Sequence, residues 1–421
     1  MTSTTWLLIL TIAAGLYMAW NIGANDVANA MGTSVGSGAL TLRNALVIAA
    51  IFEFGGAVLV GSHVTDTIRS GIIDTTLFEP GGPLGERGPM LLALGMFSAL
   101  LASGIWLQLA TMWGLPVSTT HSIVGAVAGF GFLSLGFSAL QWGEIGTIVL
   151  SWVVSPLTGA AISWGMFLFV RRSILDRSDP AGAARRVAPW LVGLVGVILM
   201  LSFIFKALKN VLSNPPLVLS WAVALGVGVL GAAGTAMLLR RQTNTPADPY
   251  RYVERVFGWL QITTAIFVAF AHGANDVANA VGPLAAVVTI IGSGFATLPH
   301  TAPVPLWVLV LGGVGIVIGL ATWGYKVIAT VGTQITEMTP SRGFSAEFGA
   351  ATTVLVASRL GLPVSTTHTL VGAVIGVGLA QGMGAINLGV IGRIVNSWVA
   401  TIPAAAGLSM VIFLVLRAVM L

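Results

Sequence analysis

The chain has 421 residues, of which 56% are hydrophobic and only 8% are charged. A soluble domain of this length needs far more charge to cover its surface, so the composition excludes a soluble globular protein and predicts an integral membrane protein. Because the chain contains 0 cysteines, disulfides, thiolate metal sites and thiol catalysis are also excluded.

The first apolar run, Trp6–Trp20, follows an uncharged start. A secretory signal has a basic start and a small-residue cleavage site, and neither is evident here. We therefore expect this run to be retained as a membrane helix. It leads directly into a polar segment of eight residues, Gly23–Ala30.

The segment Gly23–Ala30 places one carboxylate, Asp26, and two amides, Asn25 and Asn29, inside an apolar run. Such groups are costly at membrane depth and need partners. On a helix the two amides share one face, and Asp26 lies one position round. Gly23 and the alanines permit a local break that would free backbone carbonyls, and these oxygens together suit a hard cation such as sodium. The alternative is a polar zipper that only joins neighbouring helices.

The segment His63–Pro89 contains four acidic residues and two arginines. Short loops on the cytoplasmic side of membrane proteins carry an excess of Lys and Arg. This segment lacks that excess, so we expect it on the outer face.

A second polar segment, Gly114–His121, interrupts a later apolar run. Proline is tolerated in the first turn of a helix, so Pro116 is expected to open a new helical segment inside the membrane. The hydroxyls of Ser118–Thr120 would then lie beside unpaired N–H groups, an arrangement that favours anions. Ordinary N-capping is the alternative. A nucleophile–base pair of Ser118 and His121 is disfavoured because no acid orients the His; we expect that His and its later counterpart to donate hydrogen bonds that hold the segment.

Much of the net charge of +5 lies in two Arg-rich segments, 171–186 and 240–255. Clustered arginine in short loops is typical of the cytoplasmic side of a membrane, rather than of a nucleic-acid surface. Two apolar runs, Trp190–Phe205 and Leu217–Leu239, lie between these segments. They predict a hairpin that leaves and returns to the cytoplasm.

The chain also repeats itself. Gly23–Ala30 returns unchanged as Gly273–Ala280, 250 residues later, and Gly114–His121 returns unchanged as Gly361–His368, 247 residues later. Two identities of eight residues at nearly the same offset indicate an internal duplication.

The two halves are expected to enter the membrane from opposite faces. The first half starts outside and ends at the Arg-rich side, where the second half starts, so the repeats are inverted and the site lies at the midplane. Hydropathy does not separate full crossings from re-entrant hairpins. We predict a first transport repeat over 1–170, cytoplasmic Arg-rich loops around a two-helix insert over 171–255, and a second repeat over 256–421.

On these residues the sequence resembles the inorganic phosphate transporter (PiT) family. Ile51–Phe54 and the stretch Gly324–Glu347 extend the resemblance over nearly the whole chain. It implies an all-α integral membrane protein with about twelve transmembrane segments in two inverted repeats, with broken helices and re-entrant hairpins. It also implies a multi-pass protein of the cell membrane, no cofactor besides co-transported sodium, and a homodimer.

The resemblance assigns roles residue by residue. The sodium ligands would be Asn25, Asp26, Asn29, Asn275, Asp276 and Asn279. The phosphate ligands would be Ser118, Thr119, Thr120, Ser365, Thr366 and Thr367, with Asp26 and Asp276 lining the same cavity. Glu53 and Glu347 would take part in transport and cation coupling.

The predicted function is a cation-coupled symporter that imports inorganic phosphate by alternating access. Sodium is favoured because both signature copies have Asn before Asp, as in the sodium-coupled branch of the family. A proton-coupled phosphate permease, a sulfate permease and an anion channel are the alternatives. Asp26 and Asp276 could accept a hydrogen bond from protonated phosphate and would repel sulfate, which favours phosphate. No catalytic constellation points to an enzyme.

Overall fold

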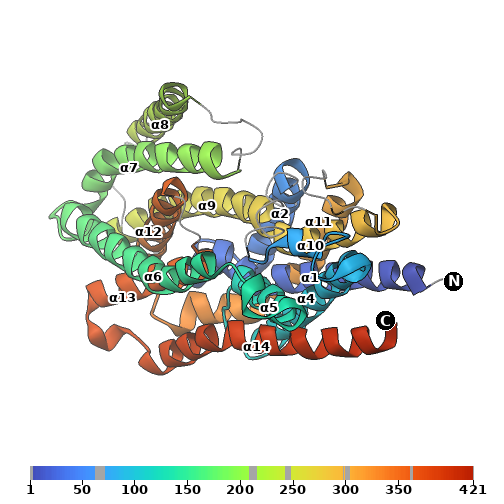
Figure 1. Ribbon diagram of the computed structural model, residues 1–421. Coiled ribbons are helices and arrows are strands. Elements are labelled where there is room, and N and C mark those ends of the chain that lie inside the picture. The colour runs from blue at the N-terminus through green and yellow to red at the C-terminus, as the bar shows by residue number, and fades with distance from the viewer. Residues whose placement is uncertain are drawn as a thin grey trace.

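The computed structural model describes residues 3–61, 72–207, 216–241, 248–296, 298, 304–360 and 364–420. These residues are almost entirely helical (Figure 1), as lipid demands, because a helix satisfies its own backbone hydrogen bonds. The first half contains α1 (Ser3–Gly36), α2 (Leu42–Val60), α4 (Gly88–Met112), α5 (Thr119–Leu135) and α6 (Trp142–Val170). The second half contains α9 (Pro249–Asp276), α10 (Ala278–Gly292), α11 (Leu306–Ala329), α12 (Pro340–Arg359), α13 (Thr366–Gln381) and α14 (Leu388–Met420).

Two further helices, α7 (Pro180–Ser202) and α8 (Leu217–Arg240), join the halves and confirm the two apolar runs predicted there. Short helical turns connect or extend the long helices: η2 (Thr75–Phe78), η3 (Gly85–Arg87), η4 (Gly136–Ala139) and η8 (Met383–Ala385), with π-helical turns at η5 (Arg171–Leu175), η6 (Phe203–Ala207) and η7 (Thr330–Gln334).

Among the described residues, 10 helices are long and apolar enough to cross a membrane, with α9 and α10 counted as one. The helices α12 and α13 fall short of that length or hydropathy, yet they correspond in sequence to α4 and α5. Adding these two gives twelve helical segments, and the predicted fold class is confirmed.

Two helix pairs form re-entrant hairpins. Beside α4 and α5, Ile73 pairs with Leu140, and beside α12 and α13, Thr336 pairs with Ile386. Each bridge joins the entry of a hairpin to its exit, so each hairpin begins and ends at one level. Among the described helices, α1, α2 and α6 remain as full crossings of the first half. Three is the odd number that an inverted repeat requires.

The two halves are interlocked. Helix α1 packs along α11, and α9 packs along α2 in the equivalent way. Gly23 lies so close to α11 that a Cβ there would overlap the carbonyl of Ile316, and Gly273 lies equally close to the carbonyl of Glu53. These glycines permit backbone contact between halves, as small residues do in membrane proteins. The residue boundaries of the repeats stay a prediction.

The expected break in the first signature is absent. Helix α1 runs unbroken through Gly23–Ala30, because Gly23 serves the close approach to α11 and the polar side chains find partners outside the helix. In the second copy the helix is interrupted at Val277, between α9 and α10. The expectation of a local break was therefore wrong for the first copy and holds for the second.

The insert lies at the periphery. Helices α7 and α8 run side by side at one edge of the molecule, opposite α14 (Figure 1). Only 17% of the apolar window of α8 is buried, against 83% for α4. Helix α8 therefore presents its apolar side chains to lipid, whereas α4 belongs to the centre.

Replacing Gly319 by Ala should destabilise the protein. A Cβ at this position of α11 would overlap the carbonyl of Trp20 in α1, and overpacking of this kind costs about 1–3 kcal/mol. Thermal unfolding in detergent is the measurement. Gly226→Ala in α8 is the control, since nothing lies within 4 Å of its Cβ. Equal melting temperatures for both variants would contradict the close backbone contact between α1 and α11.

Candidate functional site

Asn25 fastens the α4–α5 hairpin to α1. Its side-chain oxygen accepts a hydrogen bond from the backbone N–H of Val117 at 3.1 Å. Its amide nitrogen donates to the Thr111 hydroxyl at 2.9 Å and to the carbonyl of Leu115 at 3.0 Å. The interrupted backbone between α4 and α5 thus has its polar groups satisfied by a helix distant in sequence.

Asp26 lies between the tips of both hairpins. Its Oδ2 accepts a hydrogen bond from Thr119 at 2.8 Å, and its Oδ1 accepts one from Thr367 at 3.4 Å. Asn29 lies one helical turn further and donates to the Thr367 hydroxyl at 2.8 Å. The first signature therefore contacts the first hairpin through Asn25 and Asp26 and the second hairpin through Asp26 and Asn29.

The second signature likewise contacts the hairpin of the other half. Asn279 donates to the hydroxyls of Thr119 and Thr120, each at 3.3 Å. Asn275 donates to Asp276 at 2.7 Å. The structure thus brings the two signatures and the two hairpins together at one place, as the sequence predicted.

The hairpin tips are helix N-termini. Ser118 caps α5 by accepting from the N–H of His121 at 3.2 Å, and Ser365 caps α13 by accepting from His368 at 3.3 Å. Both serines therefore make the capping bonds considered as the alternative. Pro116 lies in the extended link before Ser118, which confirms the predicted helix break, whereas Pro363 is outside the described residues. Two such N-termini present N–H groups and hydroxyls that suit a compact oxyanion.

Among the described residues, the imidazole rings of His121 and His368 have no partner to which they donate the expected hydrogen bonds. Their rings lie 4.9 Å apart between the hairpins, and His121 accepts a bond from Trp152 at 3.2 Å. His368 stacks on Trp398, and its ring nitrogens have no hydrogen-bond partner among the described residues. The prediction was wrong because aromatic packing, rather than polar contact, holds these rings.

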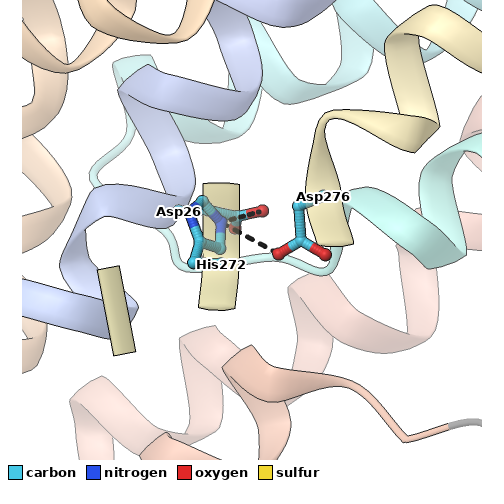
Figure 2. Close-up of side chains that lie close together, drawn as sticks. All are labelled: Asp26, His272 and Asp276. Atoms are coloured by element: carbon cyan, nitrogen blue, oxygen red, sulfur yellow. Dashed lines mark ion pairs between the residues drawn. The ribbon is translucent and has the colours of Figure 1, made fainter. Parts of the chain in front are cut away.

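The centre of the site is a histidine that the sequence analysis missed. His272 lies between two carboxylates (Figure 2), with its Nε2 2.9 Å from Asp276 and 3.7 Å from Asp26. Its Nδ1 is 3.3 Å from Glu53. All four side chains are buried. Because one imidazole can balance only one negative charge, three carboxyl groups around it need protons or metal cations as further partners.

The equivalent place in the other half is apolar. By the matching glycine contacts, Ile22 corresponds to His272 and Ile316 corresponds to Glu53. The available signal was the residue just before each signature, which differs between the two otherwise identical copies.

Glu347 belongs to a separate polar cluster. It accepts hydrogen bonds from Thr33 at 2.6 Å, Ser34 at 3.1 Å and Gln261 at 3.2 Å, and also from Thr264. These partners come from α1 and α9. Sequence alone did not indicate them, since none belongs to a repeated motif.

A cavity of about 90 Å³ lies between this cluster and the tip of the second hairpin. Its polar lining includes Asn29, His272, Asp276, Glu347 and Thr366. Glu347 and the tip residue Thr366 therefore line the same cavity.

Comparisons with known proteins agree with this geometry. The chain matches the model of the phosphate transporter family over residues 22–409. It is 48% identical to a Pyrococcus abyssi protein named as a phosphate permease, over 98% of each chain. It is 45% identical to the chloroplastic inorganic phosphate transporter 2-1 of Arabidopsis thaliana, covering 95% of this chain and 70% of that one. A solved structure described as the sodium-dependent phosphate transporter matches with a TM-score of 0.86 and 42% identity, over 98% of this chain and 100% of the other.

Replacing Asn25 by Ala should loosen the first hairpin. It leaves the buried N–H of Val117 and carbonyl of Leu115 without these partners, and each such loss costs about 1–3 kcal/mol. The measurement is the melting temperature in detergent, with protease sensitivity of the hairpin as a second readout. Asn21→Ala is the control, because the Asn21 amide donates to the carbonyl of Tyr17 in its own helix. A melting temperature for Asn25→Ala no lower than that of the control would contradict this role.

Proposed function

The chain belongs to the phosphate transporter family, and we propose that it is a sodium-coupled symporter that carries inorganic phosphate inward by alternating access. The observation that carries the proposal is the meeting of two hairpin tips and two polar signatures around one imidazole. All of these groups are at membrane depth, where an unneutralised charge is costly. A cation and an anion bound together at this place neutralise each other and the site.

The sodium ions bind at the oxygens of the two signatures. The candidate ligands are Asn25, Asp26, Asn29, Asn275, Asp276 and Asn279. Carboxylate and amide oxygens are hard ligands that suit sodium. The solved structure with 42% identity is described as sodium-dependent, which supports sodium for this chain.

Phosphate binds between the hairpin tips. The candidate ligands are Ser118, Thr119, Thr120, Ser365, Thr366 and Thr367. Thr120 and Thr366 are only half-buried and are the more accessible threonines of the two tips. In contrast, Thr119 is hydrogen-bonded to Asp26, and Thr367 is hydrogen-bonded to Asn29. The first-turn N–H groups of α5 and α13 add a positive field at the same place.

The two aspartates favour phosphate over sulfate. Protonated phosphate can donate a hydrogen bond to a carboxylate, and sulfate at neutral pH has no proton to donate. Asp26 and Asp276 therefore accept a hydrogen bond from protonated phosphate, whereas their negative charges repel sulfate.

Glu53 and Glu347 couple the cation to the movement of the repeats. Glu53 contacts His272 from α2, so a cation beside His272 alters the contact between α2 and α9. Glu347 joins α12 to α1 and α9 through its four donors, and its carboxylate can hold a cation or proton during release. Both acids lie where the halves meet.

The Arg-rich segments 171–186 and 240–255 face the cytoplasm of a cell membrane, which sets the inward direction; residues 242–247 of the second segment are outside the described residues. Residues 62–71 of the segment proposed for the outer face are also outside them. A homodimer in the bilayer, as the family resemblance implies, completes the proposal.

Neutralising Asp26 or Asp276 should abolish sodium coupling without unfolding the protein. Each of Asp26→Asn and Asp276→Asn removes one charge from a cluster with an excess of negative charge, so the melting temperature without sodium should not fall. The stabilisation by saturating sodium, about 2.7 kcal/mol at a concentration 100 times Kd, should disappear. Phosphate uptake into proteoliposomes should fall at least about tenfold.

Choline chloride at equal ionic strength is the control for that experiment. Unchanged uptake with unchanged sodium dependence in both variants would rule out the aspartates as the cation site and would leave the proposed function without its main support.

Thr120→Val should weaken phosphate more than sodium. The substitution deletes a hydroxyl at the tip, and hydrogen bonds to charged groups contribute about 1.5–3 kcal/mol, or about tenfold to a hundredfold in the KM for phosphate. The sodium concentration for half-maximal uptake should stay nearly constant, and Thr120→Ser should restore the phosphate KM. A parallel loss of sodium and phosphate affinity would count against separate binding places.

A further inference from the structure

A second polar cavity, of about 920 Å³, lies behind the tip of the first hairpin. It is bounded by the end of α4, the end of α11 and the first turns of α14. Its lining includes two basic side chains, Lys326 and Arg393, and no acidic side chain. Gln334, Asn396 and Ser397 add neutral hydrogen-bonding groups. The cavity therefore combines a net positive charge with donors on several sides.

Neither cation is neutralised by the described part of the chain. No ion pair joins Lys326 or Arg393 to an acid there; ion pairs elsewhere in the chain include Arg171–Asp176 and Arg342–Glu337. The Lys326 ammonium lies 4.0 Å from the centroid of the Trp323 ring, a contact that orients a cation without cancelling its charge. Both positive charges are thus available to a ligand.

A neighbouring cavity has the opposite character. It has a volume of about 780 Å³, shares Gln334 with the first cavity, and includes Glu337 but no basic side chain in its lining. The positive charge is therefore confined to the cavity that adjoins the hairpin.

The wall of the basic cavity is continuous with the tip of the hairpin. Gly114 and Leu115 line the cavity and lead into the link that ends at the Ser118 cap. Gly114 has a φ of +66°, and a Cβ there would lie 3.1 Å from the Thr330 hydroxyl, so the link rests directly on the end of α11. On its other side, Trp398 of α14 donates to the carbonyl of Pro116 at 2.9 Å.

The cavity opens at the Arg-rich end of the molecule. Arg171, at the end of α6, donates to the carbonyl of Ala380 near the end of α13 at 3.3 Å. Helix α14 begins a few residues later, and Arg393 lies in its second turn. The cavity and the Arg-rich segment 171–186 are therefore on one side of the membrane.

We propose that this cavity is a second anion site, in which Lys326 and Arg393 bind a phosphate group separately from the site between the hairpin tips. The guanidinium offers paired N–H donors for phosphate oxygens, and the ammonium offers a point charge. Two sources carry this group at the inner face, free inorganic phosphate and the headgroup of an anionic phospholipid. The existence of this anion site does not depend on the proposed function. A role for it in receiving phosphate released from the site between the hairpin tips rests on that function.

The test is equilibrium binding to the full chain in nanodiscs of phosphatidylcholine. Radiolabelled inorganic phosphate is titrated once with sodium and once with choline in its place. In the wild type a sodium-independent component is expected. The double variant Lys326→Gln/Arg393→Gln should weaken that component at least about tenfold and should leave the sodium-dependent component unchanged.

Three controls accompany the double variant. Arg43→Gln removes a cation at the start of α2 that does not line the cavity, and it should bind as the wild type does. Lys326→Arg/Arg393→Lys keeps both charges and should retain the component. Thermal unfolding verifies that every variant is folded.

A parallel titration with fluorescent phosphatidylglycerol distinguishes the two sources. If the double variant loses the sodium-independent binding of phosphate and the control variants keep it, the site is supported with free phosphate as its ligand. If free phosphate shows no sodium-independent component, loss of phosphatidylglycerol binding in the double variant supports the site with the lipid headgroup. Binding of both probes equal to the wild type overturns the inference. Absence of the sodium-dependent component in the wild type would instead count against the proposed function.

Discussion

Three buried carboxyl groups pack around the single imidazole of His272. Without water, such groups are stable only when charges are paired and polar atoms are hydrogen-bonded. Asp26, Glu53 and Asp276 offer more negative charge than His272 can balance. The fold brings two hairpin tips to the same place, where the hydroxyls of Thr119 and Thr367 donate to the Asp26 carboxylate and helix N-termini can hold an anion. The remaining charge balance falls to the transported ions.

The two halves form the site through nearly symmetric helix contacts, and they differ in the charged residues that they contribute to it. The glycine contacts of α1 with α11 and of α9 with α2 are alike, yet one crossing has Ile22 and Ile316 where the other has His272 and Glu53. A symmetric pair of tips suits a tetrahedral anion, which has equivalent faces. The contact of His272 with Glu53, in contrast, lies at only one of the two crossings, so the charged groups break the symmetry between the halves.

Much of the helical architecture could be predicted because the two halves of the chain contain identical motifs in the same order. Pro116 and the following hydroxyls indicated a broken hairpin, and the structure has a hairpin there with Ser118 as its cap. His272 was missed because it lies just outside the repeated motif, at a position where the two copies differ. The role of Asn25 could not be predicted either, since its partners are the Thr111 hydroxyl of α4 and two backbone atoms of the hairpin link, 86 to 92 residues away along the chain.

We propose that a sodium gradient drives phosphate through the site between the hairpin tips. Radiolabelled phosphate uptake into proteoliposomes, under an imposed sodium gradient and then under an imposed proton gradient, measures this coupling. We expect phosphate to accumulate with the sodium gradient, with weak competition by sulfate, and not with the proton gradient alone. Accumulation driven only by protons would contradict sodium coupling and would assign Asp26 and Asp276 as proton carriers.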